Sequence, residues 1–190
     1  MRFFEVSAID SIDDKQGWQG YKQYYVKPVE MKREGNLALI GSYDAKWNSF
    51  NYGWFDLSNL PKNSKYQKNP ITNRSPFPYI KLAANLSLNE KEHGYIVEVI
   101  GVEPNYRGKG LAPSLYDAAL SDLDLPILSD SKQTPAGTAL WVKFFKNPKY
   151  RVGSIDLETG EKGKAFLENN RLESDLDGNS QNIRFTLELK

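Results

Sequence analysis

Residues 95–120 constrain the fold and function of this chain more than any other stretch of its sequence. They read as an apolar strand at 95–102, a turn that contains Gly108 and Gly110, and a helix that begins near Leu111. Glycine adopts positive φ angles at little steric cost, so such a turn can direct several backbone N–H groups to one side. The start of the helix adds the positive end of the helix dipole. The pattern therefore predicts a phosphate-binding turn made of backbone groups.

Strand and helix patterns flank this segment on both sides. Before it, we expect a long loop at 58–76 and strands at 2–9, 24–29, 37–43, 52–57 and 79–88. The last of these is expected to form an antiparallel hairpin with the strand at 95–102. After the first helix, we expect a short strand at 126–130, a helix at 134–145, a strand at 150–155, a short helix at 164–172 and a strand at 183–189. This order predicts an α+β fold in one compact domain.

Charge and composition narrow the choice of partners. The 25 basic and 24 acidic residues leave a formal net charge of +1, so we expect neither nucleic acid nor an anionic membrane as a partner. The chain has no cysteine, which excludes disulfides, thiolate nucleophiles and thiolate metal ligands. Its single histidine, His93, lies in a polar turn and is expected to be solvated. We therefore expect no metal site.

The sequence also predicts where the protein is found. Residues 1–6 are expected to begin a strand and not a signal peptide. No apolar run approaches the roughly 18 residues that a membrane-spanning helix needs. We therefore expect a soluble, cytoplasmic protein.

The turn after the central strand carries a family resemblance. Arg107, Gly110 and Ala112 fit the spacing Arg-x-x-Gly-x-Ala, and residues 102–106 read Val-x-Pro-x-Tyr. In these motifs the chain resembles the GNAT superfamily of acyl-CoA-dependent N-acyltransferases. Residues 139–145, with Ala-Leu-Trp at their start and Phe-Phe at their end, are similar to the second landmark of that family. The sequence of residues 128–135 also resembles that of GNAT-like proteins of tailed bacteriophages.

The two glycines could also have a role that differs from the one this resemblance implies. They could supply the backbone angles of an ordinary strand-to-helix connection, with no ligand. A Rossmann dinucleotide site lacks its third glycine here and would not follow β hairpins in mid-chain. A Walker A loop is excluded by the spacing and by the absence of a Lys-Ser or Lys-Thr pair. The order of strand, turn, helix, short strand and second helix favours the GNAT resemblance.

The resemblance implies a mixed, mostly antiparallel central sheet flanked by helices. Residues 79–155 would form the acyl-CoA-binding core of a single domain that spans 1–190. Residues 1–75 match the family poorly and are expected to be an atypical, β-rich region on the acceptor side. Residues 157–190 would add a loop and a closing strand.

The resemblance also implies a cofactor and the residues that bind it. The co-substrate would be acetyl-CoA or another acyl-CoA, with no metal. The backbone of the turn would hold the coenzyme A pyrophosphate, and the preceding strand would splay from its neighbour so that pantetheine can bond to its free edge. Arg107 and Lys109 would add charge, and a backbone N–H at Val102 or Ile100 would polarise the thioester. The expected cofactor-binding residues are Ile100, Val102, Arg107, Gly108, Lys109, Gly110, Leu111 and Ala112.

Candidate catalytic side chains follow from what acyl transfer from a thioester to an amine needs, which is a base for the amine and an acid for the departing thiolate. Glu98 interrupts an apolar strand and is the leading candidate for the general base, because burial would raise its pKa; a salt bridge or a solvent-facing side chain is the alternative. Asp130, with Ser129, is the second choice. Trp141 stands where the family has a tyrosine that protonates the thiolate, and indole N–H is too weak an acid for that role. Tyr116, Tyr150 or water could replace it, or Trp141 could be a core residue in a domain without turnover.

Two functions from different classes follow. The first is transfer of an acyl group to an unidentified primary amine of a small molecule or protein. The second is a catalytically inactive GNAT-fold module that binds acyl-CoA or a protein partner. The aromatic residues of the N-terminal third could form a lid over the acceptor, a protein-binding face or ordinary core, namely Tyr43, Trp47, Phe50, Tyr52, Trp54 and Phe55.

Overall fold

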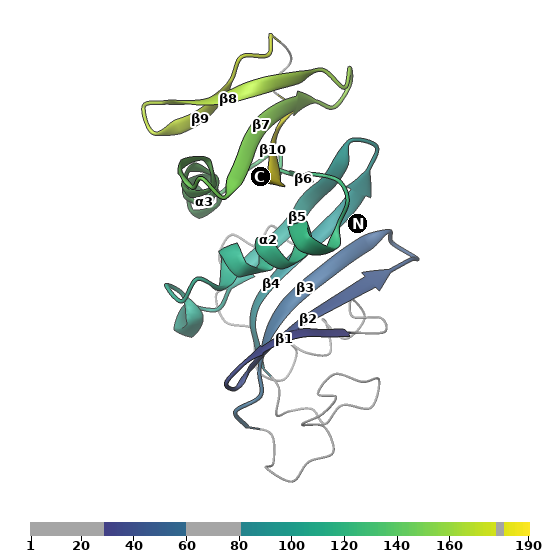
Figure 1. Ribbon diagram of the computed structural model, residues 1–190, viewed down its shortest axis with the longest axis vertical. Coiled ribbons are helices and arrows are strands. Elements are labelled where there is room, and N and C mark those ends of the chain that lie inside the picture. The colour runs from purple at the N-terminus through teal and green to yellow at the C-terminus, as the bar shows by residue number, and fades with distance from the viewer. Residues whose placement is uncertain (1–28, 60–80, 178–180) are drawn as a thin grey trace. The chain divides into compact units, whose positions relative to one another are not determined.

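The computed structural model describes residues 29–59, 81–177 and 181–190 (Figure 1). The strand expected at 2–9, nearly all of that at 24–29 and most of the loop at 58–76 lie outside these residues. Within them the fold is α+β, with mostly antiparallel strands and two α-helices of 12 residues each. The expected fold class is confirmed at this level.

Ten strands and two helices make up the described part of the chain. The strands are β1 Val29–Glu34, β2 Leu37–Asp44, β3 Ser49–Asp56, β4 Lys81–Lys91, β5 Gly94–Val102, β6 Ile127–Leu128, β7 Tyr150–Asp156, β8 Lys162–Glu168, β9 Arg171–Ser174 and β10 Ile183–Leu189. The helices are α2 Leu111–Asp122 and α3 Pro135–Lys146, and a short 3-10 turn, η2, covers Pro104–Tyr106. Neighbouring strands pair in the order β1-β2-β3-β4-β5-β6-β10-β7-β8-β9, and β5 and β6 run parallel.

These residues form two compact units. The first comprises the described residues up to Asn89 together with Val99–Ala119. The second comprises Glu90–Glu98 and the described residues from Leu120 onward. Both units contain buried apolar side chains.

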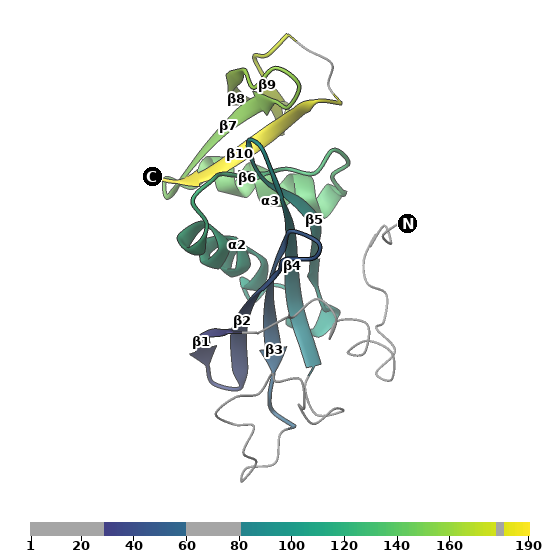
Figure 2. The ribbon, with the colours of Figure 1, turned by 90° about the vertical axis from the view of Figure 1, so that its right-hand side faces the viewer.

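In the first unit, β1 to β4 form an antiparallel sheet (Figure 2). β2 and β3 pair antiparallel from Leu37↔Asp56 to Asp44↔Ser49, and they cover the strand expected at 37–43 and nearly all of that expected at 52–57. The aromatic side chains of this region divide between core and surface. Tyr52, Trp54 and Phe55 are buried, whereas Tyr43 and Trp47 are exposed.

Helix α2 belongs to the first unit up to Ala119 and packs on its sheet. Its buried side chains are Leu111, Leu115, Tyr116 and Ala119, which recur at helical spacing. Pro113 falls in the first turn, where no intrahelical N–H bond is lost. The start of α2 at Leu111 agrees with the sequence prediction.

In the second unit, β6, β10 and β7 form consecutive antiparallel pairs. The side chain of Thr134 accepts a hydrogen bond from Gly137 N (3.1 Å) and so caps α3, which lies beside β7 and β9 (Figure 1). Trp141 and Phe144 are the buried residues of this helix. The expected helix at 134–145 and the expected strands at 150–155 and 183–189 are confirmed.

The prediction of a short helix at 164–172 is wrong. These residues form the hairpin of β8 and β9, paired from Ala165↔Ser174 to Glu168↔Arg171. Half-buried and exposed side chains alternate along β8, which is the period of a strand and not of a helix. Asn169 and Asn170 adopt positive φ angles of 48° and 62° and make the two-residue turn that favours a hairpin.

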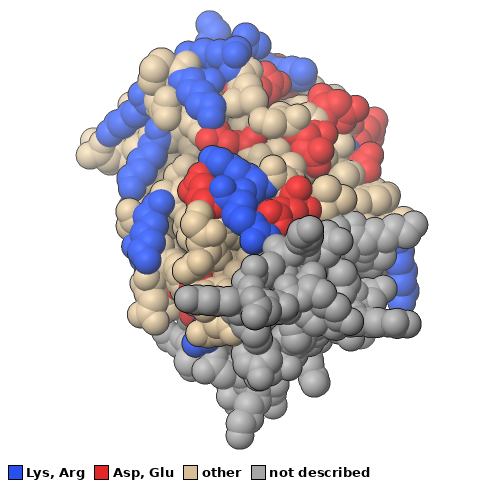
Figure 3. Space-filling view, turned by 60° about the horizontal axis from the view of Figure 1, so that its bottom comes forward, with Lys and Arg blue, Asp and Glu red and all other residues tan. Residues whose placement is uncertain are grey.

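Two further features are the hydropathy of the helices and the distribution of surface charge. No helix among the described residues is long and apolar enough to cross a bilayer. Basic and acidic side chains both appear on the face in Figure 3, and neither sign covers it alone, in keeping with the net charge of +1.

Candidate functional site

The glycine turn, which we define as residues 103–110, connects β5 to α2 within the first unit. Gly108 and Gly110 both have a φ of 75°, as the sequence predicts. A Cβ added at either position would meet no atom within 4 Å, so these glycines are needed for their backbone angles and not for close packing. Ser114 N donates to Gly110 O (3.2 Å), so the helix begins directly after the second glycine. The N–H groups of Leu111 and Ala112 therefore lie in the first helical turn, where they have no intrahelical acceptor.

Hydrogen bonds at the end of β5 determine where the Val102 peptide groups point. Glu103 N donates to Ala83 O in β4 (2.9 Å). A trans peptide directs its C=O opposite to its N–H, so Val102 O points away from β4, where it accepts from Arg107 Nε (3.2 Å). In extended backbone the N–H and C=O of one residue point to the same edge. Val102 N–H therefore also points away from β4, as a donor to a bound ligand would have to.

The N–H groups at the start of β5 and just after its end point to opposite edges of the strand. Tyr95 N donates to Pro126 O (2.9 Å), just before β6, whereas Glu103 N donates to β4. Residues separated by an even number point to the same edge of an unbroken strand. The alternation is therefore interrupted between these two residues, as in a β-bulge.

The pairing of β5 with β6 is short. It joins Tyr95 to Ile127 and Ile96 to Leu128 and includes no other described residue. The chain after β6 instead bonds to β10: Ser129 N donates to Phe185 O (2.8 Å), and Ser129 Oγ accepts from Phe185 N (3.0 Å). The described pairing of β5 with β6 thus ends at Ile96.

The basic side chains of the glycine turn make local contacts. Arg107 is bonded to the Val102 carbonyl, and Lys109 Nζ lies 5.0 Å from the centroid of the Tyr106 ring. Both residues are exposed and keep their charges at the surface of the turn. Ile100 and Val102 are half-buried.

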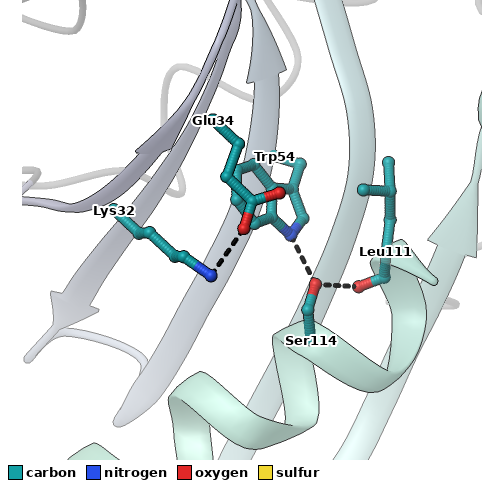
Figure 4. Close-up of polar contacts among 5 residues, drawn as sticks. All are labelled: Lys32, Glu34, Trp54, Leu111 and Ser114. Carbon is teal, nitrogen blue, oxygen red and sulfur yellow. Dashed lines mark hydrogen bonds and ion pairs between the residues drawn. The ribbon is translucent and has the colours of Figure 1, made fainter. Parts of the chain in front are cut away.

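Two contacts between β3 and the glycine-turn region are not expected from the sequence. The Tyr106 hydroxyl donates to Asp56 Oδ2 before the glycines. After them, Trp54 Nε1 donates to Ser114 Oγ (2.7 Å), and Ser114 Oγ donates to Leu111 O (2.8 Å) (Figure 4). The only sequence signal is a polar residue, Asp56, at the end of an apolar strand, which does not identify its partner.

Glu98, the expected general base, is exposed on β5. Desolvation by neighbouring atoms raises the pKa of its carboxyl group, and the positive charge of Lys91 opposes that shift. Because the side chain is exposed, solvent screens both effects and the carboxyl group can exchange protons with water.

Asp130 and Ser129 lie at the end of β6, in the second unit. Asp130 Oδ1 accepts from Lys132 N (3.2 Å) and from Ser131 Oγ (3.4 Å). Both residues line an open groove of about 1160 Å³, together with residues of α3, β9 and β10 such as Val142, Leu172 and Phe185. Asp130 therefore faces solvent-filled space and is accessible to a small molecule.

Trp141, at the expected position of the acid, and the two tyrosines considered in its place are all buried. Trp141 is 3% exposed and packs edge-on against Phe144, with ring centroids 6.0 Å apart. Tyr150 is 4% exposed and packs in the same cluster, 5.1 Å from Phe144. Tyr116 is 1% exposed in α2. All three side chains thus serve as core residues of their units.

Metal binding has no support in the described residues. No group of three or more His, Asp or Glu side chains among them is arranged to hold a metal ion. His93 is half-buried and its ring packs near Gly160, where an added Cβ would lie 3.2 Å from His93 Cε1. The side chain of His93 is thus partly exposed.

No family model, curated protein or solved structure matches this chain. Its function therefore has to be inferred from its own residues and contacts.

Proposed function

We propose that the protein is an acyl-CoA-dependent N-acyltransferase with a GNAT-like core, which transfers an acyl group, most simply acetyl, to a primary amine. The observation that carries this proposal is the glycine turn. Gly108 and Gly110 at positive φ lead directly into the N-terminus of α2. Backbone N–H groups and a helix dipole together favour a phosphate group at this place.

The strand before the turn supports the same proposal. It pairs with β6 over two residues only, and its N–H direction changes before Glu103. A strand edge that is no longer paired offers N–H and C=O groups to an extended ligand. Pantetheine, which carries two amide groups, is such a ligand. The pyrophosphate would then bind at Gly108–Ala112, with Arg107 and Lys109 adding positive charge.

The reaction requires few side chains. The amine nitrogen attacks the thioester carbonyl carbon, the C–S bond breaks, the nitrogen loses a proton and the thiolate gains one. Val102 N–H, or that of Ile100, would donate a hydrogen bond to the developing oxyanion. Glu98, whose pKa is raised, would take the amine proton directly or through water. Asp130 is the second candidate for this base.

The burial of Trp141, Tyr116 and Tyr150 favours a second candidate function. None of these side chains is exposed to a thiolate that leaves toward solvent. Water can protonate the thiolate, but a domain without turnover needs no acid at all. The alternative is therefore a module that binds acyl-CoA and does not transfer the acyl group.

Calorimetry of the full chain tests binding first. Coenzyme A should bind at least about tenfold more tightly than pantetheine, because only coenzyme A carries the pyrophosphate. Equal affinities, or no binding of either ligand, would contradict the proposal.

Thiol release then separates the enzyme from the module. Acetyl-CoA is incubated with the protein and a panel of primary amines, and free thiol is measured over time. Amine-dependent release supports the transferase. Binding without release across the panel supports the module.

A further inference from the structure

We propose that β3 positions the glycine turn, so that Trp54 and Asp56 control affinity for the phosphate-bearing ligand without touching it. This inference rests on the proposed function. The two residues lie on one strand of the first unit, and each holds one end of the segment that contains the glycines. Asp56 accepts from Tyr106, and Trp54 donates to Ser114.

The two glycines add no side-chain contacts of their own to the turn. Among the described residues, and apart from the chain neighbours of each glycine, no atom lies within 4 Å of the place where a Cβ at Gly108 or Gly110 would be. Glycine also has more accessible backbone conformations than any other residue, so a segment with two of them is costly to order. The conformation of the turn therefore depends on its other contacts, among them the bond from Arg107 to Val102 and the contacts at its two ends.

The contact at the helix side is buried. Trp54 is 1% exposed, and its indole N–H is bonded to Ser114 Oγ at 2.7 Å. The Ser114 hydroxyl in turn donates a hydrogen bond to Leu111 O at 2.8 Å, which links Trp54 to the first residue of α2 (Figure 4). An indole N–H donates only one hydrogen bond, so loss of this acceptor leaves a buried donor unsatisfied. The contact therefore holds the first turn of α2, which supplies part of the expected phosphate site.

The contact on the strand side is charge-assisted. Asp56 accepts the Tyr106 hydroxyl at Oδ2 and Ser58 N at Oδ1 (2.8 Å). The hydrogen bonds from Tyr106 and Ser58, with the charge of Lys81, outweigh burial and lower the pKa of Asp56, so the acceptor is ionised at neutral pH. Ionised acceptors make stronger hydrogen bonds than neutral ones. The Nζ atom of Lys109 lies 5.0 Å from the centroid of the Tyr106 ring, so the bond to Asp56 also holds the ring on which Lys109 rests.

A pre-ordered turn binds more tightly, because less conformational freedom is lost when the ligand arrives. Removing either contact should therefore weaken coenzyme A binding, by about tenfold for one lost hydrogen bond of ordinary strength. Affinity for pantetheine, which lacks the pyrophosphate, should change much less. A general loss of folding would lower both affinities together.

The test uses Tyr106→Phe, which removes one hydrogen bond, and Ser114→Ala, which removes two, and both keep the remaining side-chain volume. Tyr43→Phe is the matched control, because the Tyr43 hydroxyl donates to Asn48 Oδ1 (2.9 Å) at an exposed site of the same unit. Calorimetry gives the dissociation constants for coenzyme A and pantetheine. Amide hydrogen exchange by NMR reports on residues 107–112 without any ligand.

We expect faster exchange at residues 107–112 and weaker coenzyme A binding in both test variants, and neither change in the control. Unchanged exchange at these amides would overturn the inference, whatever the ligand affinities. Absence of coenzyme A binding in the unaltered protein would instead contradict the proposed function, and the exchange data would still decide whether β3 orders the turn. If Tyr106→Phe does not fold, Ser114→Ala alone decides, because alanine is the better helix former at that position.

Discussion

The glycine turn and the residues after β6 differ in which groups would carry their function: backbone groups in the turn and side chains after β6. In the turn, the groups that would meet a ligand are backbone N–H groups, and their directions follow from two positive φ angles and a few hydrogen bonds. In residues 129–150, the expected chemistry belongs to side chains, and Trp141 and Tyr150 are buried in an aromatic cluster. The comparison teaches that backbone sites can be inferred from residue type and order. Side-chain roles depend on which way each residue faces.

The largest effect should come from the aromatic cluster. Trp141→Ala should lower the free energy of unfolding by about 3–5 kcal/mol, because it removes a buried ring from contact with Phe144 and Phe185. Chemical denaturation measures this change. A loss of less than about 1 kcal/mol would mean that Trp141 is not a core residue, and its place in the comparison would change.

Glu98→Gln tests the only side chain of β5 to which catalysis is assigned. If Glu98 is the general base, amine-dependent thiol release at neutral pH should fall by about 100-fold, with coenzyme A affinity unchanged. In the unaltered protein, activity should rise as pH increases through the raised carboxyl pKa, because only the ionised form accepts a proton. Asp130→Asn is the comparison variant. A larger loss there than in Glu98→Gln would assign the base to Asp130.

The Tyr106–Asp56 bond should add about 1 kcal/mol to stability, measured as the difference in unfolding free energy between the unaltered protein and Tyr106→Phe. The pKa of Asp56 is lowered in the folded protein, so its contribution is present above its ordinary pKa and is lost as pH falls through the folded value. Desolvation and the bond to Asp56 raise the pKa of Tyr106 to about 12. Its contribution is present below its ordinary pKa and is lost as pH rises toward 12.

The difference should therefore be constant between about pH 6 and pH 9 and should shrink in acid. Denaturant titrations of both proteins across this range measure it. A difference that falls steadily between pH 6 and pH 9 would show that the bond does not join these two groups.

The smallest effect should come from the basic side chains of the glycine turn. Lys109→Ala should weaken coenzyme A binding only about two- to threefold, because an exposed lysine is well solvated and screened by salt. Calorimetry at two salt concentrations measures this. A 100-fold loss of coenzyme A affinity would mean that the Lys109 side chain, and not the backbone, supplies most of the binding. The glycine turn would then no longer differ from the residues after β6.

Much of this fold could be predicted from the sequence because its elements carry strong local patterns. The β2–β3 hairpin, α2, α3 and β10 lie where apolar periodicity predicts them. The β8–β9 hairpin was not predicted, since its apolar residues are few and its Asn-Asn turn resembles a loop. Alternation along residues 162–168 was the signal that favoured a strand over the expected helix.

The glycine turn could be predicted for a similar reason, because only glycine adopts its backbone angles freely. The contacts of Trp54 and Asp56 could not, since they join residues 60 and 50 positions apart in the chain. Strand register and helix placement decide such contacts, and neither can be derived from local pattern. The exposure of Glu98 and the burial of Tyr150 likewise depend on strand register and helix placement.

The central claim is that the backbone of the glycine turn binds the coenzyme A pyrophosphate, and two substitutions at Gly110 test it most directly. Asparagine tolerates positive φ better than most residues, so Gly110→Asn keeps the turn, and Gly110→Asp adds a negative charge to nearly the same shape. Gly35→Asp is the control, because Gly35 also has a positive φ, with open space around it, in the turn between β1 and β2.

Calorimetry with coenzyme A should show binding that is weakened several-fold in Gly110→Asn, lost by about 100-fold or more in Gly110→Asp, and unchanged in Gly35→Asp. Equal coenzyme A affinities in the two Gly110 variants would contradict the claim, because a carboxylate at a pyrophosphate site must repel the ligand.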